Sequence, residues 1–145
     1  MRLARFAQWL AGLWAGTLLC IGLLAAPAGF AMLAAQDAGR VAGRMFMQEA
    51  YLSLVIGVVL LLIERKRAAA DLAPGRARVL TANILLVLGT IFCTIAGYFA
   101  VQPMMAAART GQGAVSFMAL HAVSAGFFGL KGLLACVLAW RLSAR

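Results

Sequence analysis

Residues 45–63 read MFMQEAYLSLVIGVVLLLI, and the charged cluster ERKR follows directly at residues 64–67. A helix needs about 20 mostly apolar residues to cross the roughly 30 Å hydrocarbon core of a bilayer, and this run has that length. The run lacks the strict polar and apolar alternation of a strand, so a helix is the structure that satisfies its backbone groups in lipid. This stretch predicts a transmembrane helix with a basic flank.

Three more runs of this kind occur, and the four spans are predicted at about residues 6–32, 45–63, 79–105 and 115–140. Hydrophobic residues make up 65% of the 145 residues and charged residues 12%, against about 45–50% and about 25% in soluble domains. A soluble domain of this size could not hide such an excess. We therefore predict an all-α, integral membrane four-helix bundle, with residues 1–145 forming a single transmembrane domain.

The basic residues divide unequally between the two sides of the predicted spans. One side has Arg2, Arg5, Arg65, Lys66, Arg67, Arg76, Arg78, Arg141 and Arg145, and the other has Arg40, Arg44 and Arg109. Short loops rich in Lys and Arg stay in the cytoplasm, so both termini and the central loop are predicted to be cytoplasmic. The net charge of +9 is thus interpreted as a topology signal and not as a sign of nucleic-acid binding.

The first run also has features of a secretory signal, since basic residues precede it and small residues follow it. Three further apolar runs favour an uncleaved first span. Helices in lipid pack closely through small residues, and the candidate packing positions are Gly12, Gly16, Gly89, Gly97, Gly126 and Gly129. Such faces would suit the bundle itself, a homo-oligomer or a membrane-protein partner. The alternative is that these glycines are ordinary members of Gly- and Ala-rich helices.

Several polar and sulfur-containing side chains are predicted to gather at the outer side of the membrane. Apart from the initiator, every methionine lies at a predicted outer end of a span, and His121 lies near the start of the fourth span. Thioether and imidazole groups suit monovalent copper and similar soft ions. The candidate metal ligands are His121, Met118, Met104, Met105, Met47 and Glu49. The alternatives are methionines that fill gaps, a helix-entry role for Glu49 near Arg44, and a histidine that makes one interhelical hydrogen bond.

Lys131 lies deep in the fourth span, where a charge is costly. Its long stem is predicted to extend toward the cytoplasmic headgroups, and Asn83 is the alternative polar partner. Pro27 and Pro103 each remove a helical donor and clash with the carbonyl four residues earlier, at Leu23 and Phe99. These irregularities fit either a shallow outer cavity or two helix ends.

Four short runs occur in order along the chain: WAG at 14–16, APAGF at 26–30, AGRVAGRMF at 38–46 and FMALHAVS at 117–124. Together they resemble the small bacterial membrane proteins of the domain of unknown function family 4149, which are similar to eukaryotic transmembrane protein 205. The resemblance implies a four-span bundle in the bacterial inner membrane, without an established activity. Where an Asn is expected after the last run, this chain has Phe127, Phe128 and Gly129.

Motifs typical of enzymes are missing from the sequence, which has no phosphate loop, no GxSxG and no HExxH. The three cysteines are dispersed, without a CxxC pair, and are interpreted as buried thiols. The preferred hypothesis is a non-enzymatic, multi-pass inner-membrane protein that binds or passes a small soft cation, with monovalent copper as the candidate. The alternatives are a structural or assembly subunit without a ligand, and a haem-handling protein with His and Met as axial ligands.

Overall fold

The structure is a computed structural model and describes residues 2–70 and 80–144. Within these residues, four helices are long and apolar enough to cross a membrane, and no strand occurs. The prediction of an all-helical chain with four apolar helices is therefore confirmed. Three of the charges used in the topology argument, Arg76, Arg78 and Arg145, lie outside the described residues, as does the predicted start of the third span at residue 79.

The four spans differ in how continuous their helices are. The first consists of α1 (Arg2–Leu19), a π-helical turn η1 (Cys20–Ala25) and α2 (Ala26–Met32). The second is the single helix α3 (Ala35–Ala70). The third consists of α4 (Ala82–Thr94), a second π-helical turn η2 (Ile95–Ala100) and α5 (Val101–Arg109), and the fourth is α6 (Phe117–Ser143).

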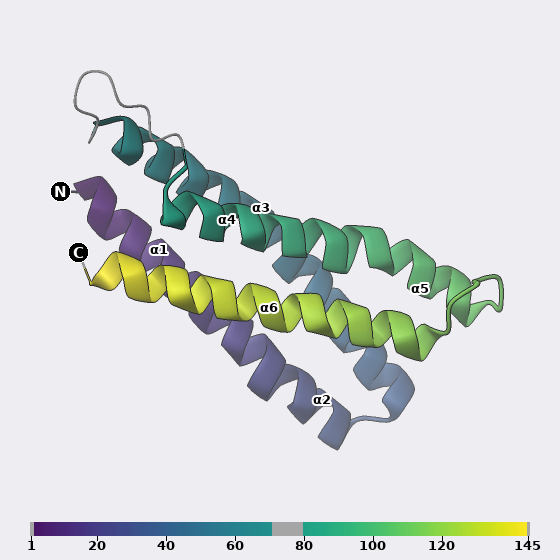
Figure 1. The fold of residues 1–145 in the computed structure, drawn as a ribbon. Coiled ribbons are helices and arrows are strands. Elements are labelled where there is room, and N and C mark those ends of the chain that lie inside the picture. Colours follow the sequence, from purple (N-terminus) through teal and green to yellow (C-terminus); the bar gives the residue numbers. More distant parts are fainter. Residues whose placement is uncertain (1, 71–79, 145) are drawn as a thin grey trace.

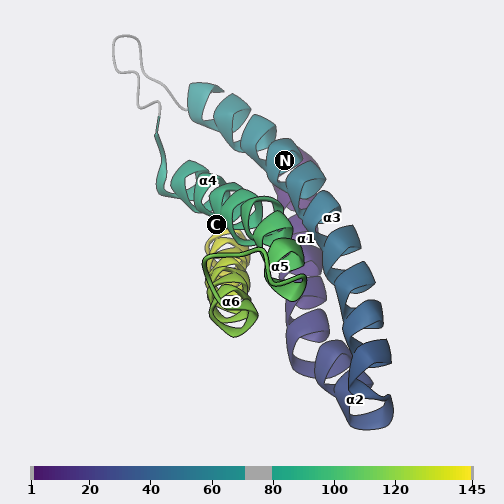
Figure 2. The same cartoon turned by 90° about the vertical axis from the view of Figure 1, so that its right-hand side faces the viewer.

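Figure 1 shows the two chain ends at one end of the bundle, where α3 also ends and α4 begins. We call this the terminal end, and we call the opposite end, with the α2–α3 and α5–α6 connections, the distal end. Both α1 and α4 pack against α3 and α6. Toward the distal end α2 stays with α3 and diverges from α6, as Figures 1 and 2 show. The bundle is thus closed in its terminal half and splayed in its distal half.

Large apolar side chains from all four spans form the main core. Its members include Trp14, Leu18, Leu60, Val87 and Leu138, each at most 1% exposed. Other large apolar side chains point outward, among them Phe6, Leu13, Leu62, Phe92 and Leu133. In water this exposure would oppose folding, whereas in lipid it needs no compensation. The pattern of burial therefore agrees with a bundle surrounded by lipid.

The helix α3 is longer than the predicted second span. Its 36 residues extend over roughly 54 Å at about 1.5 Å per residue, well beyond the hydrocarbon core. Residues 36–44 and 64–70, which lie outside the predicted apolar span, are helical as well. Asp37 in the first turn forms an ion pair with Arg40, an arrangement that favours a helix N-terminus. An apolar window identifies only the part of a helix that lies in lipid.

The prolines change the helix type and do not end the helices. Pro27 lacks an N–H and crowds the carbonyl of Leu23, which lies in η1, and Pro103 has the same relation to Phe99 in η2. A π-helical turn widens the helix and relieves such crowding. Ser124 on α6 donates a hydrogen bond to the carbonyl oxygen of Gly97 in η2, at 2.8 Å. Both spans therefore continue to the distal end with a widened turn at mid-length.

Candidate functional site

Two opposite charges meet in the interior of the bundle. The Lys131 ammonium on α6 donates hydrogen bonds to both carboxylate oxygens of Glu49 on α3, at 2.8 and 2.7 Å. Lys131 is 3% exposed and Glu49 is 4% exposed. The prediction that Lys131 extends toward the headgroups is therefore wrong, because a carboxylate 82 positions away in the chain offers it a nearer partner.

The ion pair belongs to a chain of hydrogen bonds across three helices. The Ser53 hydroxyl donates to Glu49, and the Trp14 indole N–H on α1 donates to the Ser53 oxygen at 2.8 Å. The Lys131 ammonium also lies 5.1 Å from the centroid of the Phe128 ring, within the range of a cation–π contact. Within the described residues no buried side-chain nitrogen or oxygen atom lacks a partner. Both charges are thus held in place by hydrogen bonds to buried partners.

A cavity of about 660 Å³ lies beside this ion pair, and residues from all four spans line it. Glu49 and Lys131 are both on its wall, and η1 and η2 contribute Gly22 and Gly97. The other polar lining side chains include Thr94, Tyr98, Gln102, His121 and Ser124, and the aromatic ones are Phe30, Phe46, Tyr98 and Phe128. Its size lies within the range of about 300–1,000 Å³ that is common for small-molecule sites.

Part of the cavity wall lies on the distal side of the ion pair. His121 precedes Lys131 by ten positions on α6, which corresponds to about 15 Å along the helix. The His121 ring stacks on Phe117, with centroids 6.0 Å apart, and the Arg109 guanidinium lies 4.8 Å from the centroid of the same Phe117 ring. Through the Phe117 ring, the Arg109 guanidinium at the end of α5 is thus linked to His121 on the cavity wall.

The predicted metal ligands are only partly brought together. Glu49, His121 and Met105 line the cavity, whereas Met47, Met104 and Met118 do not, and the Met118 side chain is 71% exposed. Among the described residues, no three His, Cys, Asp or Glu side chains form a group that could hold a metal ion. Both oxygens of the Glu49 carboxylate already accept hydrogen bonds from Lys131. Copper binding stays a prediction of the sequence.

The predicted packing glycines fall into two groups. At Gly97 a Cβ would overlap the Cβ of Phe127, and at Gly89 it would lie 3.0 Å from the Leu134 side chain. At Gly12, Gly16, Gly126 and Gly129 a Cβ would meet no atom within 4 Å. Close contacts that the sequence did not single out occur at Gly57 and Gly22, where a Cβ would lie 2.8 Å from Ile91 and 2.9 Å from Phe128.

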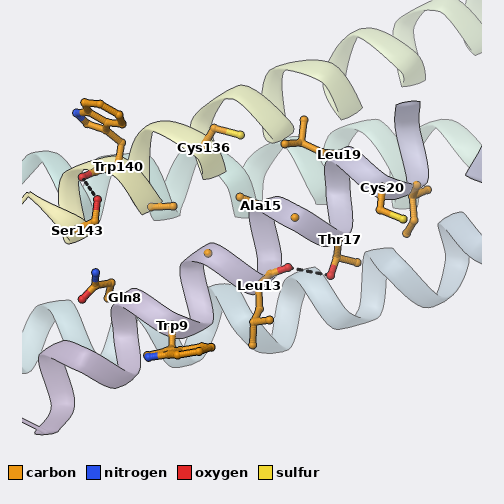
Figure 3. Close-up of a pocket in the computed structure, with 14 residues that line it drawn as sticks. Gln8, Trp9, Leu13, Ala15, Thr17, Leu19, Cys20, Cys136, Trp140 and Ser143 are labelled. Atoms are coloured by element: carbon orange, nitrogen blue, oxygen red, sulfur yellow. Dashed lines mark hydrogen bonds between the residues drawn. The ribbon is translucent and has the colours of Figure 1, made fainter. Parts of the chain in front are cut away.

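A second hollow is an open groove between α1 and α6 in the terminal half (Figure 3), and Gly12 and Gly16 are among the residues that line it. Its exposed aromatic residues are Trp9 and Trp140. The Thr17 hydroxyl on α1 donates a hydrogen bond to the carbonyl oxygen of Leu13 on the same helix, at 2.9 Å. Figure 3 shows this bond and a similar one from Ser143 to Trp140. With its hydroxyls occupied in this way, the groove has the character of a lipid-facing surface.

A second polar cluster holds the terminal end together. Asn83 at the start of α4 donates to Glu64 of α3 at 2.8 Å and accepts from Arg141 of α6 at 3.1 Å. Glu64 also pairs with Arg67 at 2.6 Å. Asn83 is therefore a partner of Glu64 and Arg141, and the alternative prediction that it serves Lys131 is wrong. We call Glu64, Arg67, Asn83 and Arg141 the terminal cluster.

Sequence reasoning missed the contact between Glu49 and Lys131, although it identified both residues. It placed the carboxylate near the outer end of its span and the ammonium near the inner half of another. The sequence did not show how α3 and α6 are rotated about their axes, and this rotation turns the Glu49 and Lys131 side chains toward each other. One acid and one base within apolar spans were the signal that could have paired them.

Four apolar helices, a lipid-compatible surface and a buried charge pair define the chain as a multi-pass helical membrane protein. The family model described as Domain of unknown function (DUF4149) matches residues 9–114. The chain belongs to this family. Neither a curated protein nor a solved structure matches it.

Proposed function

We propose that this chain is a membrane-embedded binding protein that holds a small, largely apolar ligand in the cavity beside Glu49 and Lys131. The observation that carries the proposal is a charge pair, almost fully buried, on the wall of a cavity lined by all four spans. A buried ion pair adds little to stability compared with well-packed apolar residues of similar size. Ionisable side chains within membrane spans are therefore more often explained by function than by packing.

The shape of the bundle supports access from the distal end. The terminal half is closed by the main core and the terminal cluster, whereas α2 and α6 diverge in the distal half (Figure 1). Phe30 on α2 and His121 on α6 line the cavity on the two sides of this divergence. A ligand would enter between these two helices, from the lipid or from the water at the distal surface.

The charge distribution supports a distal end outside the cell. The described basic residues near the terminal end include Arg2, Arg5, Arg65, Lys66 and Arg67, while the distal end has Arg40, Arg44 and Arg109 against one acid, Asp37. Since cytoplasmic loops carry the excess of Lys and Arg, the terminal end is proposed to be cytoplasmic. The family resemblance adds a bacterial inner membrane to this proposal.

Binding of a neutral probe tests the proposal. Tritiated decanol is added to detergent-purified protein on scintillation-proximity beads, and saturable binding is measured by displacement with unlabelled decanol. The variant Gly129→Phe fills the cavity, because Gly129 lines it and a Cβ there meets no atom within 4 Å. We expect saturable binding by the wild type and its loss in this variant.

The matched control is Gly126→Phe. Gly126 lies one turn earlier on α6, also has open space around its Cβ position, and does not line the cavity. Decanol binding in this variant should equal that of the wild type. A wild type without saturable binding, or equal losses in the two variants, would show that the cavity is not a ligand site.

A further inference from the structure

We infer that the ligand is an amphipathic carboxylate, or an acid of similar shape, and that it binds to Lys131 together with one proton that Glu49 takes up. This inference rests on the proposed function and names the ligand class of the same cavity. In the ligand-bound state the acid head accepts hydrogen bonds from the Lys131 ammonium. The apolar tail lies along the cavity toward Phe46 and Phe30.

The charge balance of the cavity wall limits the class of ligand that can bind. Glu49 and Lys131 neutralise each other, and the remaining titratable groups on the cavity wall are Cys93, Tyr98, His121 and Cys136. An anion added to this neutral pair would bring an uncompensated charge into a medium of low dielectric constant. A proton added to the Glu49 carboxylate removes that charge. The carboxylic acid then releases Lys131, which stays protonated and pairs with the ligand.

The surroundings of the two charged groups favour an anionic ligand over a cationic one. When Glu49 is neutral, its acid group keeps the hydrogen bond from Ser53, which in turn is held by Trp14. The Lys131 ammonium keeps its contact with the Phe128 ring and remains on the cavity wall. A cationic ligand would instead pair with Glu49 and require Lys131 to lose its proton, and on the way to the cavity it would meet the exposed Arg44 and Arg109 of the distal surface.

The distal surface also attracts anions. Arg44 and Arg109 are exposed there, and Arg40 is balanced by Asp37. Arg109 is linked to the cavity wall through the stack of Phe117 and His121. A positive field near a cavity raises the local concentration of anions and their rate of entry. The shape of the cavity, the charge balance of its wall and the positive charge of the distal surface thus all favour an acid with an apolar tail as the ligand.

The experiment compares decanoate with decanol, which has the same tail and no charge. Wild-type affinity for decanoate should rise about tenfold for each unit of falling pH, the slope for uptake of one proton, while decanoate itself stays ionised. Decanol binding should be independent of pH. The variant Glu49→Gln imitates the protonated acid, so it should bind decanoate at alkaline pH as tightly as the wild type does at acidic pH, with no pH dependence.

The double variant Glu49→Gln/Lys131→Met removes both charges and so avoids leaving one of them buried alone. It should keep decanol binding. Its affinity for decanoate should be about 10- to 100-fold lower than that of Glu49→Gln, because the hydrogen bonds from the Lys131 ammonium to the ligand are lost. The variant His121→Gln is the control for the other basic group of the cavity, and its decanoate affinity should retain the wild-type pH slope.

Several results would overturn the inference and leave the proposed function intact, because decanol binding reports the cavity independently. They are wild-type decanoate binding without pH dependence, weaker decanoate binding in Glu49→Gln, or loss of the pH slope in His121→Gln. Tighter binding of decylammonium or of 2-aminodecanoic acid than of decanoate would assign the cavity to a cation or a zwitterion. Absence of saturable decanol binding would instead reject the proposed function itself.

Discussion

Replacing Lys131 by Met should destabilise the protein far more than replacing both members of the buried ion pair. In Lys131→Met the Glu49 carboxylate stays buried with only the Ser53 hydroxyl as a described hydrogen-bond donor. In the double variant Glu49→Gln/Lys131→Met neither side chain is charged, and the Met side chain is similar in length to the Lys stem. The free energy lost in Lys131→Met measures the cost of leaving the Glu49 carboxylate buried without its partner, and the loss in the double variant measures what the ion pair contributes to stability.

The expected magnitudes follow from the geometry. Two unit charges 2.7 Å apart attract by about 6 kcal/mol at an effective dielectric constant of about 20. Desolvation of the two groups offsets much of this attraction, while loss of one partner from a buried pair typically costs about 3–5 kcal/mol. We therefore expect Lys131→Met to lower the free energy of unfolding by about 3–5 kcal/mol and the double variant by less than about 1.5 kcal/mol.

Unfolding in mixed micelles with increasing dodecyl sulfate, followed by the helical circular dichroism signal, measures these free energies. A full double-mutant cycle with Glu49→Gln gives the coupling between the two side chains. If Lys131→Met and the double variant are equally stable at neutral pH, Lys131 and Glu49 do not form a buried pair, and the inferred site loses its basis.

Three further predictions concern packing, topology and metal binding. Gly97→Ala should destabilise the bundle by about 1–3 kcal/mol, the usual effect of overpacking, because its Cβ would overlap Phe127; Gly126→Ala should show no loss, and equal effects in dodecyl sulfate unfolding would refute the assigned contact. A reporter fused after the last residue should report the cytoplasm, whereas one inserted at Thr110 should report the outside; an outside signal at the C-terminus would contradict the proposed orientation. For the soft-cation prediction, monovalent copper titrated under reducing conditions should bind the wild type and lose affinity in His121→Ala, with unfolding measured alongside; a wild type that binds no copper would end that hypothesis.

The fold was largely predictable from the sequence, because length and apolar content alone identify a helix that crosses a bilayer. The apolar run at 45–63 predicted its span. Pro27 and Pro103 indicated irregular helix geometry, but not that the helices continue through a π-helical turn. The helix ends were less predictable, since polar stretches such as residues 36–44 continue a helix into water without an apolar signal. Here intrinsic helix propensity and the Asp37–Arg40 pair sustain the helix.

The site was less predictable than the fold, because it depends on contacts between distant helices. Depth along a span could be approximated for Glu49 and Lys131, but the rotation of each helix about its axis could not. That rotation brings the two charges together and leaves Met104 and Met118 exposed. A charged side chain in lipid needs a partner inside the protein, and this requirement, applied to every charge within the spans, is the argument that would have found the pair.

Several features that weaken a helical bundle coincide around one cavity. Pro27 and Pro103 produce a widened turn in the first and third spans, and these turns border the cavity through Gly22 and Gly97. On the fourth span Gly129 and Gly132 also line it, and a Cβ at either would meet no atom within 4 Å. Ordinary apolar side chains at Gly129 and Gly132 would fill part of the hollow.

Irregular turns and open glycine positions that cluster in one place are more readily explained by function than by fold, because the rest of the bundle is stable without them. The terminal half shows what this chain forms where packing alone operates. There, Leu60, Val87 and Leu138 are fully buried, and the terminal cluster satisfies its charges at the edge of the bundle. In the distal half, α2 and α6 diverge (Figure 1), and the buried pair of Glu49 and Lys131 lies on the wall of the cavity. The contrast between the two halves is the structural reason for placing ligand binding at Glu49 and Lys131.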